Sequence, residues 1–307
     1  MNMISPLKGL EIRVPASIAN LGPGFDTLAV AVELYLNLSV TIAGGVNQLR
    51  FEFPDCKIDG ENYIERAFQF AARQRAVDFP SLHVVVRSDI PMRSGLGSSA
   101  AATVAGLRLY EAVAGPLPEQ GLLNAACALE GHPDNVAAAL LGGLTVSCQL
   151  PDRSAFAVKL DWPDGLRFLV LTPHYALSTS ASREALPELI PREDAVFNLQ
   201  RIALLLQAVQ SGNHALLREA LHDRVHQPYR QKLVPALEEL LALDHPDLLG
   251  VCLSGAGPSI VGLAERNFEE IEKLFSDAYR KTGLPFTIRC LAAHQDRVGV
   301  PQPVAIA

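Results

Sequence analysis

The sequence predicts an α+β protein built from two domains. Segments with the pattern of strands alternate with segments that have the pattern of helices, but without the regular β-α-β repetition of a doubly wound parallel sheet. The chain has 307 residues, of which 49% are hydrophobic and 19% charged, so it can bury a large core and is long enough for two domains of ordinary size. The polar stretch "LDWPDGL" (160–166) marks the predicted boundary, which gives domains 1–163 and 164–307.

The strands are predicted from short runs of alternating or continuous apolar residues. Residues 36–42, "LNLSVTI", alternate between apolar and polar, as a half-buried strand does. Three further strands are predicted at "LHVVV" (82–86), "RFLVL" (167–171) and "FTIRC" (286–290).

The helices are predicted from apolar periodicity and from start and stop signals. "SAAATVAGLRLYEAVAG" (99–115) begins at serines and ends at a glycine that a proline follows. "EDAVFNLQRIALLLQAV" (193–209) is the most apolar helical segment. In "NFEEIEKLFSDAYRKTG" (267–283), Asn267 and Glu270 have the spacing of a capping box. One face of that helix carries apolar side chains, namely Phe268, Ile271, Phe275 and Ala278.

Charge and cysteine content exclude several classes of protein. The net charge of -7 leaves no basic stripe to neutralise phosphates, which argues against nucleic acid or an acidic membrane as a partner. The five cysteines show no C-x-x-C pair, which disfavours a disulfide framework and a zinc site (Cys56, Cys127, Cys148, Cys252 and Cys290). The N-terminus lacks the apolar region of a signal peptide, and no run of about 18 apolar residues occurs. We therefore expect a soluble, cytoplasmic protein.

The segment "SGLGSSAAA" (94–102), called the glycine-rich loop below, predicts an anion site. Glycines let backbone amides approach a ligand without an intervening Cβ. The serines and alanines begin a helix, whose N-terminus presents free N–H groups and the positive end of the dipole. Together these features suit a phosphate, and the serine hydroxyls could reach a magnesium ion held by it.

Other interpretations of the glycine-rich loop remain open at this point. It could be only a capped helix start whose alanines pack against a sheet. Gly95, Gly97 and Ala100 also fit the dinucleotide fingerprint G-x-G-x-x-A, but "RSDIPMRS" separates them from the preceding strand, where that fingerprint should follow directly. A Walker-type loop is excluded because no G-x-x-x-x-G-K-[ST] occurs, so positive charge would have to come chiefly from magnesium.

Two further loops are built from small residues. "VPASIANLGPGFDTLAVAVELY" (14–35) contains a tight bend between a strand and an apolar run, and "LSGAGPSIVGL" (253–263) contains a turn between two strand-like runs. Either alone is typical of a hairpin turn. Three such loops in one chain indicate that their backbone packs closely around a bound ligand.

These motifs resemble those of the galacto-, homoserine, mevalonate and phosphomevalonate kinase superfamily. "PMRSGLGSSAAA" resembles its phosphate loop, and the motifs "SIANLGPGFDTL", "EGHPDNVAAALLGG" and "SGAGPSI" are most similar to the homoserine kinase branch. The resemblance spans residues 13–263. It implies an N-terminal ATP-binding domain like the second domain of ribosomal protein S5, a ferredoxin-like C-terminal domain and a homodimer. It also implies ATP-dependent phosphorylation of the side-chain hydroxyl of L-homoserine, giving O-phospho-L-homoserine on the route to threonine.

The resemblance also implies which residues would bind ATP and Mg²⁺. Ser98 and Glu130 would be the metal ligands and, with Asn135, the catalytic residues, while Asn62 would lie near the adenine. A solvated glutamate at a helix end is the alternative for Glu130. The triphosphate would be held through the loop, namely by Pro91, Ser94, Gly95, Leu96, Gly97, Ser98, Ser99, Ala100 and Ala101.

A zwitterionic amino acid needs an acceptor for its ammonium group and preferably an arginine fork for its carboxylate. By the resemblance, Asp26 and His132 would serve the amino end, and Arg183 and Arg230 the carboxylate. The side chains expected to line the hydroxyl region are Asn20, Asn135 and Thr179.

The expected site lacks an obvious catalytic base. Asn135 stands where mevalonate kinase and some other relatives place an aspartate, and an amide cannot ionise to take a proton. We therefore expect catalysis without a side-chain base, with Asp134 as the residue that could contradict this. Alternative functions are phosphorylation of another small molecule such as mevalonate, a non-catalytic nucleotide-binding regulator and, more distantly, a Rossmann-type oxidoreductase.

Overall fold

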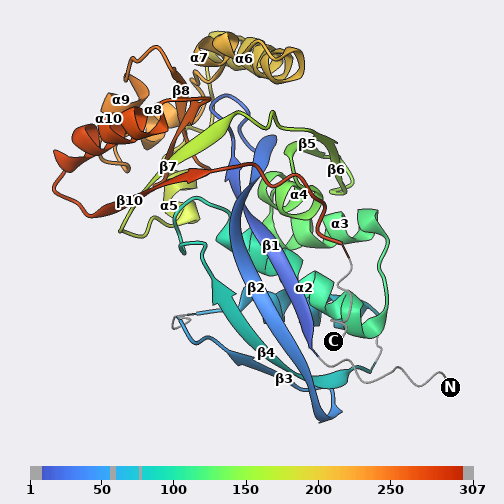
Figure 1. Cartoon of the computed structure of the whole chain (residues 1–307). Coiled ribbons are helices and arrows are strands. Elements are labelled where there is room, and N and C mark those ends of the chain that lie inside the picture. Colours follow the sequence, from blue (N-terminus) through green and yellow to red (C-terminus); the bar gives the residue numbers. More distant parts are fainter. Residues whose placement is uncertain (1–8, 56–59, 76–77, 300–307) are drawn as a thin grey trace.

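The computed structural model describes residues 9–55, 60–75 and 78–299 as two sheets with helices packed on them (Figure 1). Cys56 and residues 1–8, which include the start used to argue against a signal peptide, lie outside the described residues. The other four cysteines are free thiols. Within the described ranges, no helix is long and apolar enough to span a bilayer.

The N-terminal half is organised around one very long strand. β2 (Leu28–Val46) pairs with β1 along one edge, while β4 and β5 share its other edge near opposite ends. The sheet order is β3-β4-β2-β5-β6, with β1 beside β2. The other strands of this sheet are β1 (Leu10–Ala19), β3 (Leu49–Glu52), β4 (Pro80–Ser88), β5 (Leu144–Gln149) and β6 (Ala155–Leu160). The segments predicted as strands at 36–42 and 82–86 lie within β2 and β4.

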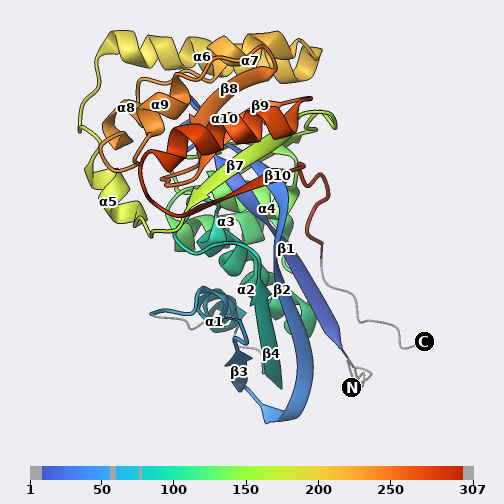
Figure 2. The ribbon, with the colours of Figure 1, turned by 60° about the vertical axis from the view of Figure 1, so that its left-hand side comes forward.

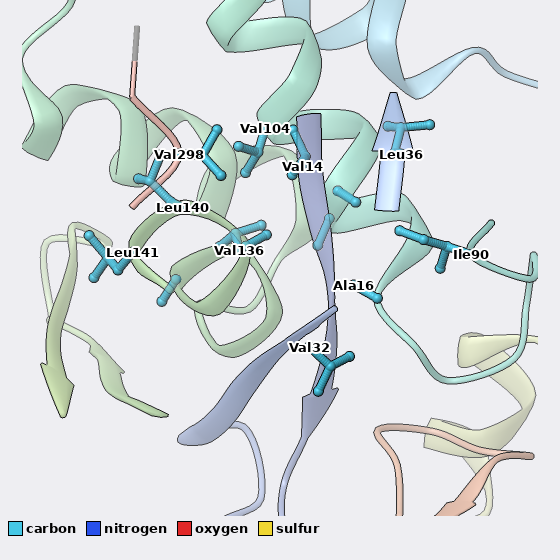
Figure 3. Close-up of a cluster of buried hydrophobic side chains, with 14 of the residues drawn as sticks. Val14, Ala16, Val32, Leu36, Ile90, Val104, Val136, Leu140, Leu141 and Val298 are labelled. Carbon is cyan, nitrogen blue, oxygen red and sulfur yellow. The ribbon is translucent and has the colours of Figure 1, made fainter. Parts of the chain in front are cut away.

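Four helices cover this sheet: α1 (Tyr63–Arg75), α2 (Ser98–Ala114), α3 (Glu119–Glu130) and α4 (Asp134–Leu141). α2 and α4 pack directly against β1 and β2, and α1 and α3 pack against α2. In Figure 3, Val14 of β1, Val104 of α2 and Val136 of α4 lie in one apolar cluster, and each is at most 1% exposed. Burying a valine fully contributes about 1.5–3 kcal/mol, so this layer holds α2 and α4 firmly on the sheet.

The C-terminal half has the topology expected of a ferredoxin-like domain. Its four antiparallel strands are β7 (Arg167–Pro173), β8 (Leu248–Leu253), β9 (Ile260–Ala264) and β10 (Phe286–Leu291). Their order β10-β7-β9-β8, with helices between β7 and β8 and again between β9 and β10, is that of a split β-α-β fold. The strands predicted at 167–171 and 286–290 lie in β7 and β10, and the predicted two-domain α+β fold is confirmed.

The helices of this half differ in burial. They are α5 (Thr179–Glu184), α6 (Arg192–Ser211), the 3₁₀ turn η1 (His214–Leu216), α7 (Leu217–Ala220), α8 (Gln227–Arg230), α9 (Leu237–Leu241) and α10 (Phe268–Arg280). α9 and α10 cover the sheet, and Ile271 and Phe275 of α10 are fully buried. α6, which was predicted to be the most apolar helix, is less apolar than α2 and α4 and lies on the outer surface (Figures 1 and 2), where Leu199 is 66% exposed.

The capping box predicted at the start of α10 is wrong. Asn267 has a left-handed φ of 55°, and its side chain makes no capping hydrogen bond. Its Nδ2 donates instead to a carboxylate oxygen of Asp247 at 2.6 Å. A charged acceptor outside the helix thus takes the asparagine side chain, although α10 still begins at the predicted place.

Backbone hydrogen bonds connect the two halves, in addition to the chain that links them. The expected boundary at 163/164 lies between β6 and β7. Beyond β10 the chain returns to the N-terminal half, where Ala293 bridges Val32 and the Val298 N–H donates to the Leu140 carbonyl. Between the halves, the Gly255 N–H donates to the Ala19 carbonyl at 3.0 Å, so the first bend and the late turn of the sequence meet there.

Candidate active site

The glycine-rich loop presents open amides toward one side. α2 begins at Ser98, and Gly97 before it adopts a left-handed conformation (φ 68°, ψ 29°). In the described part of the chain, none of the backbone N–H groups of residues 95–100 donates to a protein acceptor. Six such donors at the start of a 17-residue helix form a site for an anion of phosphate type.

The carbonyls of the same loop are held by both halves of the protein. Ser17 N–H donates to the Leu96 carbonyl at 3.1 Å, and Ser259 N–H to the Ser94 carbonyl at 3.0 Å. The Ser254 hydroxyl donates to the Gly95 carbonyl at 2.7 Å. With its carbonyls directed into the protein, the loop is held in a conformation that leaves its N–H groups free.

Glu130, at the end of α3, points at the first turn of α2. Its Oε2 accepts a hydrogen bond from the Ser99 hydroxyl at 2.6 Å, and its Oε1 accepts one from Thr103 at 2.8 Å. The predicted metal pair was Ser98 and Glu130, whereas the hydroxyl in contact with Glu130 is that of Ser99. Thr103 was not predicted, although its spacing of four residues from Ser99 places both on one helix face.

Asn62 lies at the start of α1, where its Oδ1 accepts hydrogen bonds from the N–H groups of Ile64 and Glu65. One turn later, Arg66 donates to the carbonyl of Leu129, next to Glu130. The start of α1 is therefore near the C-terminal end of α3, where Glu130 lies. Contact between Asn62 and an adenine stays a prediction.

Asp26 and Arg183 form a bidentate ion pair between the halves. The Arg183 guanidinium donates to the two carboxylate oxygens of Asp26 at 2.8 and 3.0 Å. Asp26 ends the first bend, and Arg183 lies on α5. The two residues predicted for opposite ends of an amino acid are thus brought together, and in this structure each satisfies the other.

Arg230 is a second guanidinium at the same place, and it is only 2% exposed. Burial and, to a smaller extent, the charge of Arg183 lower the pKa of Arg230 to about 10, against the opposing effect of Asp26. The guanidinium carbons of Arg183 and Arg230 lie 5.7 and 5.4 Å from the ring centre of Phe25. Two cations around one ring, one of them buried, form a place where a carboxylate would be stabilised.

His132 lies between Glu130 and α4, and Asp134 is the first residue of α4. His132 Nδ1 is 2.7 Å from Asp134 Oδ1, and the same oxygen accepts the Asn135 N–H at 2.7 Å. Burial lowers the pKa of His132, but the hydrogen bond and charge of Asp134, together with Asp26, outweigh it, so the pKa is raised. Because both Asp26 and Arg183 act on His132, this histidine belongs to the same cluster as the ion pair.

The Asn135 amide has one orientation that satisfies its neighbours. Its Nδ2 lies 3.3 Å from Asp134 Oδ1, and its Oδ1 accepts from the Ser17 hydroxyl at 2.7 Å. The reverse orientation would face two oxygen acceptors toward each other. Ser17 is fully buried and also anchors the glycine-rich loop, so it links that loop to the predicted substrate residues. It was not predicted, because a serine in a strand carries no distinctive signal.

Two predicted residues have other roles or few contacts here. Asn20 is 3% exposed, and its amide joins the Asp26 N–H to the Gly255 carbonyl, so it holds the bend in shape. Thr179 begins α5 and is exposed, one turn before Arg183. Their contact with a substrate hydroxyl stays a prediction.

A hollow of about 620 Å³ lies elsewhere, beside α6. None of the predicted site residues borders it; the lining residues are Pro191, Arg192, Glu193, Val196, Phe197, Gln200 and Arg224. The chemistry-bearing side chains are instead at the junction of the two halves, which is where the site is assigned.

Comparison with known proteins identifies the family of the chain. The profile of the GHMP kinases N terminal domain matches residues 62–143, and that of the GHMP kinases C terminal domain matches residues 205–281. The chain is 43% identical to the homoserine kinase of Deinococcus radiodurans over 263 residues, covering 84% of this chain and 85% of that one.

Two further relatives extend the match. The homoserine kinase of Solibacter usitatus is 39% identical over 288 residues, covering 89% and 91% of the two chains. The crystal structure of homoserine kinase from Cytophaga hutchinsonii superposes with a TM-score of 0.85 at 23% identity, covering 98% and 99%. The chain therefore belongs to the GHMP kinase family and is an enzyme of its homoserine kinase branch.

Proposed function

We propose that this enzyme transfers the γ-phosphoryl group of ATP to the side-chain hydroxyl of L-homoserine, producing O-phospho-L-homoserine on the route to threonine. One observation carries the proposal. A loop of open amides lies directly against a cluster that holds an acid, a histidine and two arginines. An added Cβ at Gly97 of the loop would lie 3.0 Å from Oδ1 of Asn135, and Asn135 shares the Asp134 carboxylate with His132 of this cluster. The homoserine kinase relatives support the choice of substrate.

The ATP triphosphate binds the N–H groups of residues 95–100 at the start of α2. Glycine at positions 95 and 97 lets this loop pack closely on the protein while its N–H groups stay free, since an added Cβ would lie 2.4 Å from the Ser254 carbonyl oxygen or 2.1 Å from the Ser17 hydroxyl oxygen. The helix dipole adds a partial positive charge at the same point. Because the loop carbonyls are already bonded, no reorganisation of the loop is needed when the phosphates arrive.

The oxygen donors beside the loop fit Mg²⁺. Glu130 supplies a carboxylate and Ser99 a hydroxyl, and Mg²⁺ in phosphate sites uses one or two carboxylates together with substrate phosphates. When bound, the ion neutralises charge on the phosphates during transfer. Thr103 orients the Glu130 carboxylate from its other oxygen. Ser98, the residue predicted from the sequence, is the adjacent hydroxyl and remains a candidate ligand.

The amino acid binds across the junction of the halves. Its ammonium group pairs with Asp26, assisted by His132, and its carboxylate takes the guanidinium groups of Arg183 and Arg230. The ion pair between Asp26 and Arg183 marks both partners as accessible to a zwitterion, since their side chains are 32% and 38% exposed. Mevalonate has no ammonium group and would offer Asp26 no partner beyond Arg183, which argues for an amino acid substrate.

The chemistry proceeds without a side-chain base. The homoserine oxygen forms a bond to the γ-phosphorus, the bond to the bridging oxygen breaks, and the hydroxyl proton passes to a phosphoryl oxygen. Since the transition state of phosphoryl transfer is loose, early deprotonation gives little advantage. Asn135 offers an amide N–H toward this region while its oxygen is held by Ser17. Positioning by these groups supplies the acceleration.

A coupled ADP-release assay with Mg-ATP tests the proposal against L-homoserine, D-homoserine, L-serine, L-threonine and mevalonate. Turnover with L-homoserine alone is the expected result. Turnover with mevalonate alone would keep the loop assignment and overturn the amino acid site. ATP binding without turnover of any acceptor would favour the non-catalytic regulator. The homodimer implied by the family resemblance and the cytoplasmic location expected from the sequence stay predictions, which gel filtration and cell fractionation test.

A further inference from the structure

His226 lies fully buried at the junction of the two halves and contacts both. Its Nε2 lies 2.7 Å from the carbonyl oxygen of Gly22, in the bend that carries Asp26. Its Nδ1 lies 3.1 Å from Nη1 of Arg230. Its ring stacks on Phe25 with centroids 5.4 Å apart. One side chain therefore touches the bend from the N-terminal half and the buried arginine from the C-terminal half.

The neighbours of His226 determine its tautomer. An arginine has no acceptor, so Nδ1 of His226 must accept the hydrogen bond from Arg230. Nε2 then carries the proton and donates to the Gly22 carbonyl. Burial lowers the pKa of His226, and the charge of Arg230 does so too, against the effects of Asp223 and Asp26. The ring is therefore neutral, with one donor and one acceptor, and both are used.

This contact leaves one part of Arg230 available. Nη1 is shared between His226 and the Gly255 carbonyl at 3.0 Å, and Nε faces the Ser182 carbonyl at 3.3 Å. Within the described residues, Nη2 of Arg230 has no acceptor. The guanidinium is held on two edges, and a single nitrogen remains for a ligand.

His226 is itself held in place by Asp223. The Asp223 carboxylate accepts the backbone N–H groups of Val225 at 2.9 Å, His226 at 3.0 Å and Gln227 at 2.6 Å. Asn198 ties the same carboxylate to the bend, because its Nδ2 donates both to Asp223 and to the Pro23 carbonyl. These bonds fix the start of α8 and with it the spacing between His226 and Arg230.

We propose that His226 is a positioning residue for the amino acid substrate: it holds the free nitrogen of Arg230 and the Asp26 bend at the separation that a zwitterion spans. This inference rests on the proposed function, and it concerns a residue that would not touch the substrate. A histidine with a merely structural role would affect both substrates alike. A positioning residue affects the amino acid and leaves ATP binding unchanged.

The test uses three variants at this position, with KM and kcat for both substrates and the Kd of L-homoserine by calorimetry. His226→Leu removes both hydrogen bonds, and we expect KM and Kd for L-homoserine to rise about 10- to 100-fold. KM for ATP should stay within about twofold, because no hydrogen bond joins His226 to residues 94–102 of the glycine-rich loop. His226→Gln keeps an amide donor and an acceptor and should restore KM to within about fivefold of the wild type. His226→Asn, with the shorter amide, retains the Arg230 contact alone and should be intermediate.

Two controls separate positioning from folding. His222→Gln changes an exposed histidine four residues earlier and should leave both KM values unchanged. Ile271→Val lowers stability within the core of α10 without touching the site. If His226→Leu does not fold, the Gln and Asn variants decide.

Three outcomes overturn the inference. One is equal loss of ATP and homoserine affinity. A second is a rise in KM for L-homoserine in His226→Leu that is no larger than the rise in Ile271→Val, when the two variants have matched melting temperatures. The third is a His226→Gln variant whose KM for L-homoserine is no lower than that of His226→Leu. If His226→Leu does not fold, the comparison is with His226→Asn. If wild-type enzyme does not turn over L-homoserine at all, the proposed function fails and the inference falls with it. If only the variants behave otherwise than expected, the proposed function stands.

Discussion

Gly97 is the residue whose substitution the structure predicts in most detail. It precedes α2 with φ 68° and ψ 29°, a left-handed conformation. A Cβ added there would lie 2.1 Å from the Ser17 hydroxyl oxygen and 3.0 Å from Asn135 Oδ1. The first distance is far too short, so in Gly97→Ala the Ser17 hydroxyl must move away. When it moves, its 2.7 Å hydrogen bond to Asn135 is lost.

The cost has two parts. An alanine in the left-handed region costs about 1–2 kcal/mol. Leaving the Asn135 amide oxygen without its partner costs about 1–3 kcal/mol. The sum of about 2–5 kcal/mol is smaller than the stability of a typical domain, so the variant should fold at 25 °C. Displacement of the loop by about 1 Å should still lower kcat/KM about 100-fold.

Urea unfolding and ADP-release kinetics measure the two effects, with Gly212→Ala as the matched control. Gly212 has φ 71° and ψ 9°, close to those of Gly97, but nothing lies within 4 Å of a Cβ added there. It should therefore show only the backbone strain of about 1–2 kcal/mol, with full activity. Equal stability loss in the two variants, with Gly97→Ala fully active, would refute the reasoning.

A double variant isolates the steric contact. Ser17→Ala removes the oxygen at 2.1 Å and leaves the Ser17 Cβ at 3.4 Å, an ordinary contact distance. The free energies of unfolding of the two single variants should therefore not add. The double variant should be more stable than their sum by about 1 kcal/mol or more. Simple additivity would mean that the loop moves as a whole and that the clash is not the source of the loss.

Three further predictions concern α3 and α4. Glu130→Gln keeps the contacts to the hydroxyls of α2 but removes the charge, so kcat at saturating Mg-ATP should fall about 100-fold or more while the melting temperature changes little; an unchanged kcat would remove Glu130 from the metal site. Asp134→Asn keeps an oxygen for the Asn135 N–H and should retain kcat within about tenfold, whereas loss of a base would cost about 100- to 10,000-fold with homoserine binding preserved. The raised pKa of His132 stabilises the folded state at low pH: the contribution is complete below the ordinary histidine pKa of 6.5 and is lost as pH rises through the higher folded-state pKa. The difference in unfolding free energy between the wild type and His132→Gln should therefore shrink as pH rises across this range, and a pH-independent difference would contradict the assignment.

The sequence predicted the fold through features that are local in the chain. The strands at 36–42 and 82–86 and the helix that begins at Ser98 are set by apolar periodicity and by glycine and serine signals, which neighbouring residues determine. The exposed face of α6 could not be predicted in this way, since the apolar residues of that helix do not show which of them will meet a partner. Asn267 illustrates the same limit: its spacing suits a capping box, but Asp247, twenty residues away, takes the side chain.

The candidate site shows where a motif is informative and where it is not. Glycine-rich loops carry a signal because backbone conformation restricts which residues fit. Ser17 and His226 carry none, since their roles come from contacts with Asn135 and Arg230 that only the fold creates. The pairing of Ser99 with Glu130 depends on the rotation of α2 about its axis, which the pair of adjacent serines leaves open.

Residues of both halves form the hydrogen bonds that hold the ATP site and the amino acid site. The carbonyls of the glycine-rich loop are bonded by Ser17 from one half and by Ser254 and Ser259 from the other. The amino acid cluster likewise combines residues of both halves. A substitution that separates the halves should therefore weaken ATP and homoserine together. Loss of His226 leaves the serine contacts intact and should weaken homoserine alone. The ratio of the two affinities thus distinguishes a variant that opens the junction from one that misplaces Arg230 within it.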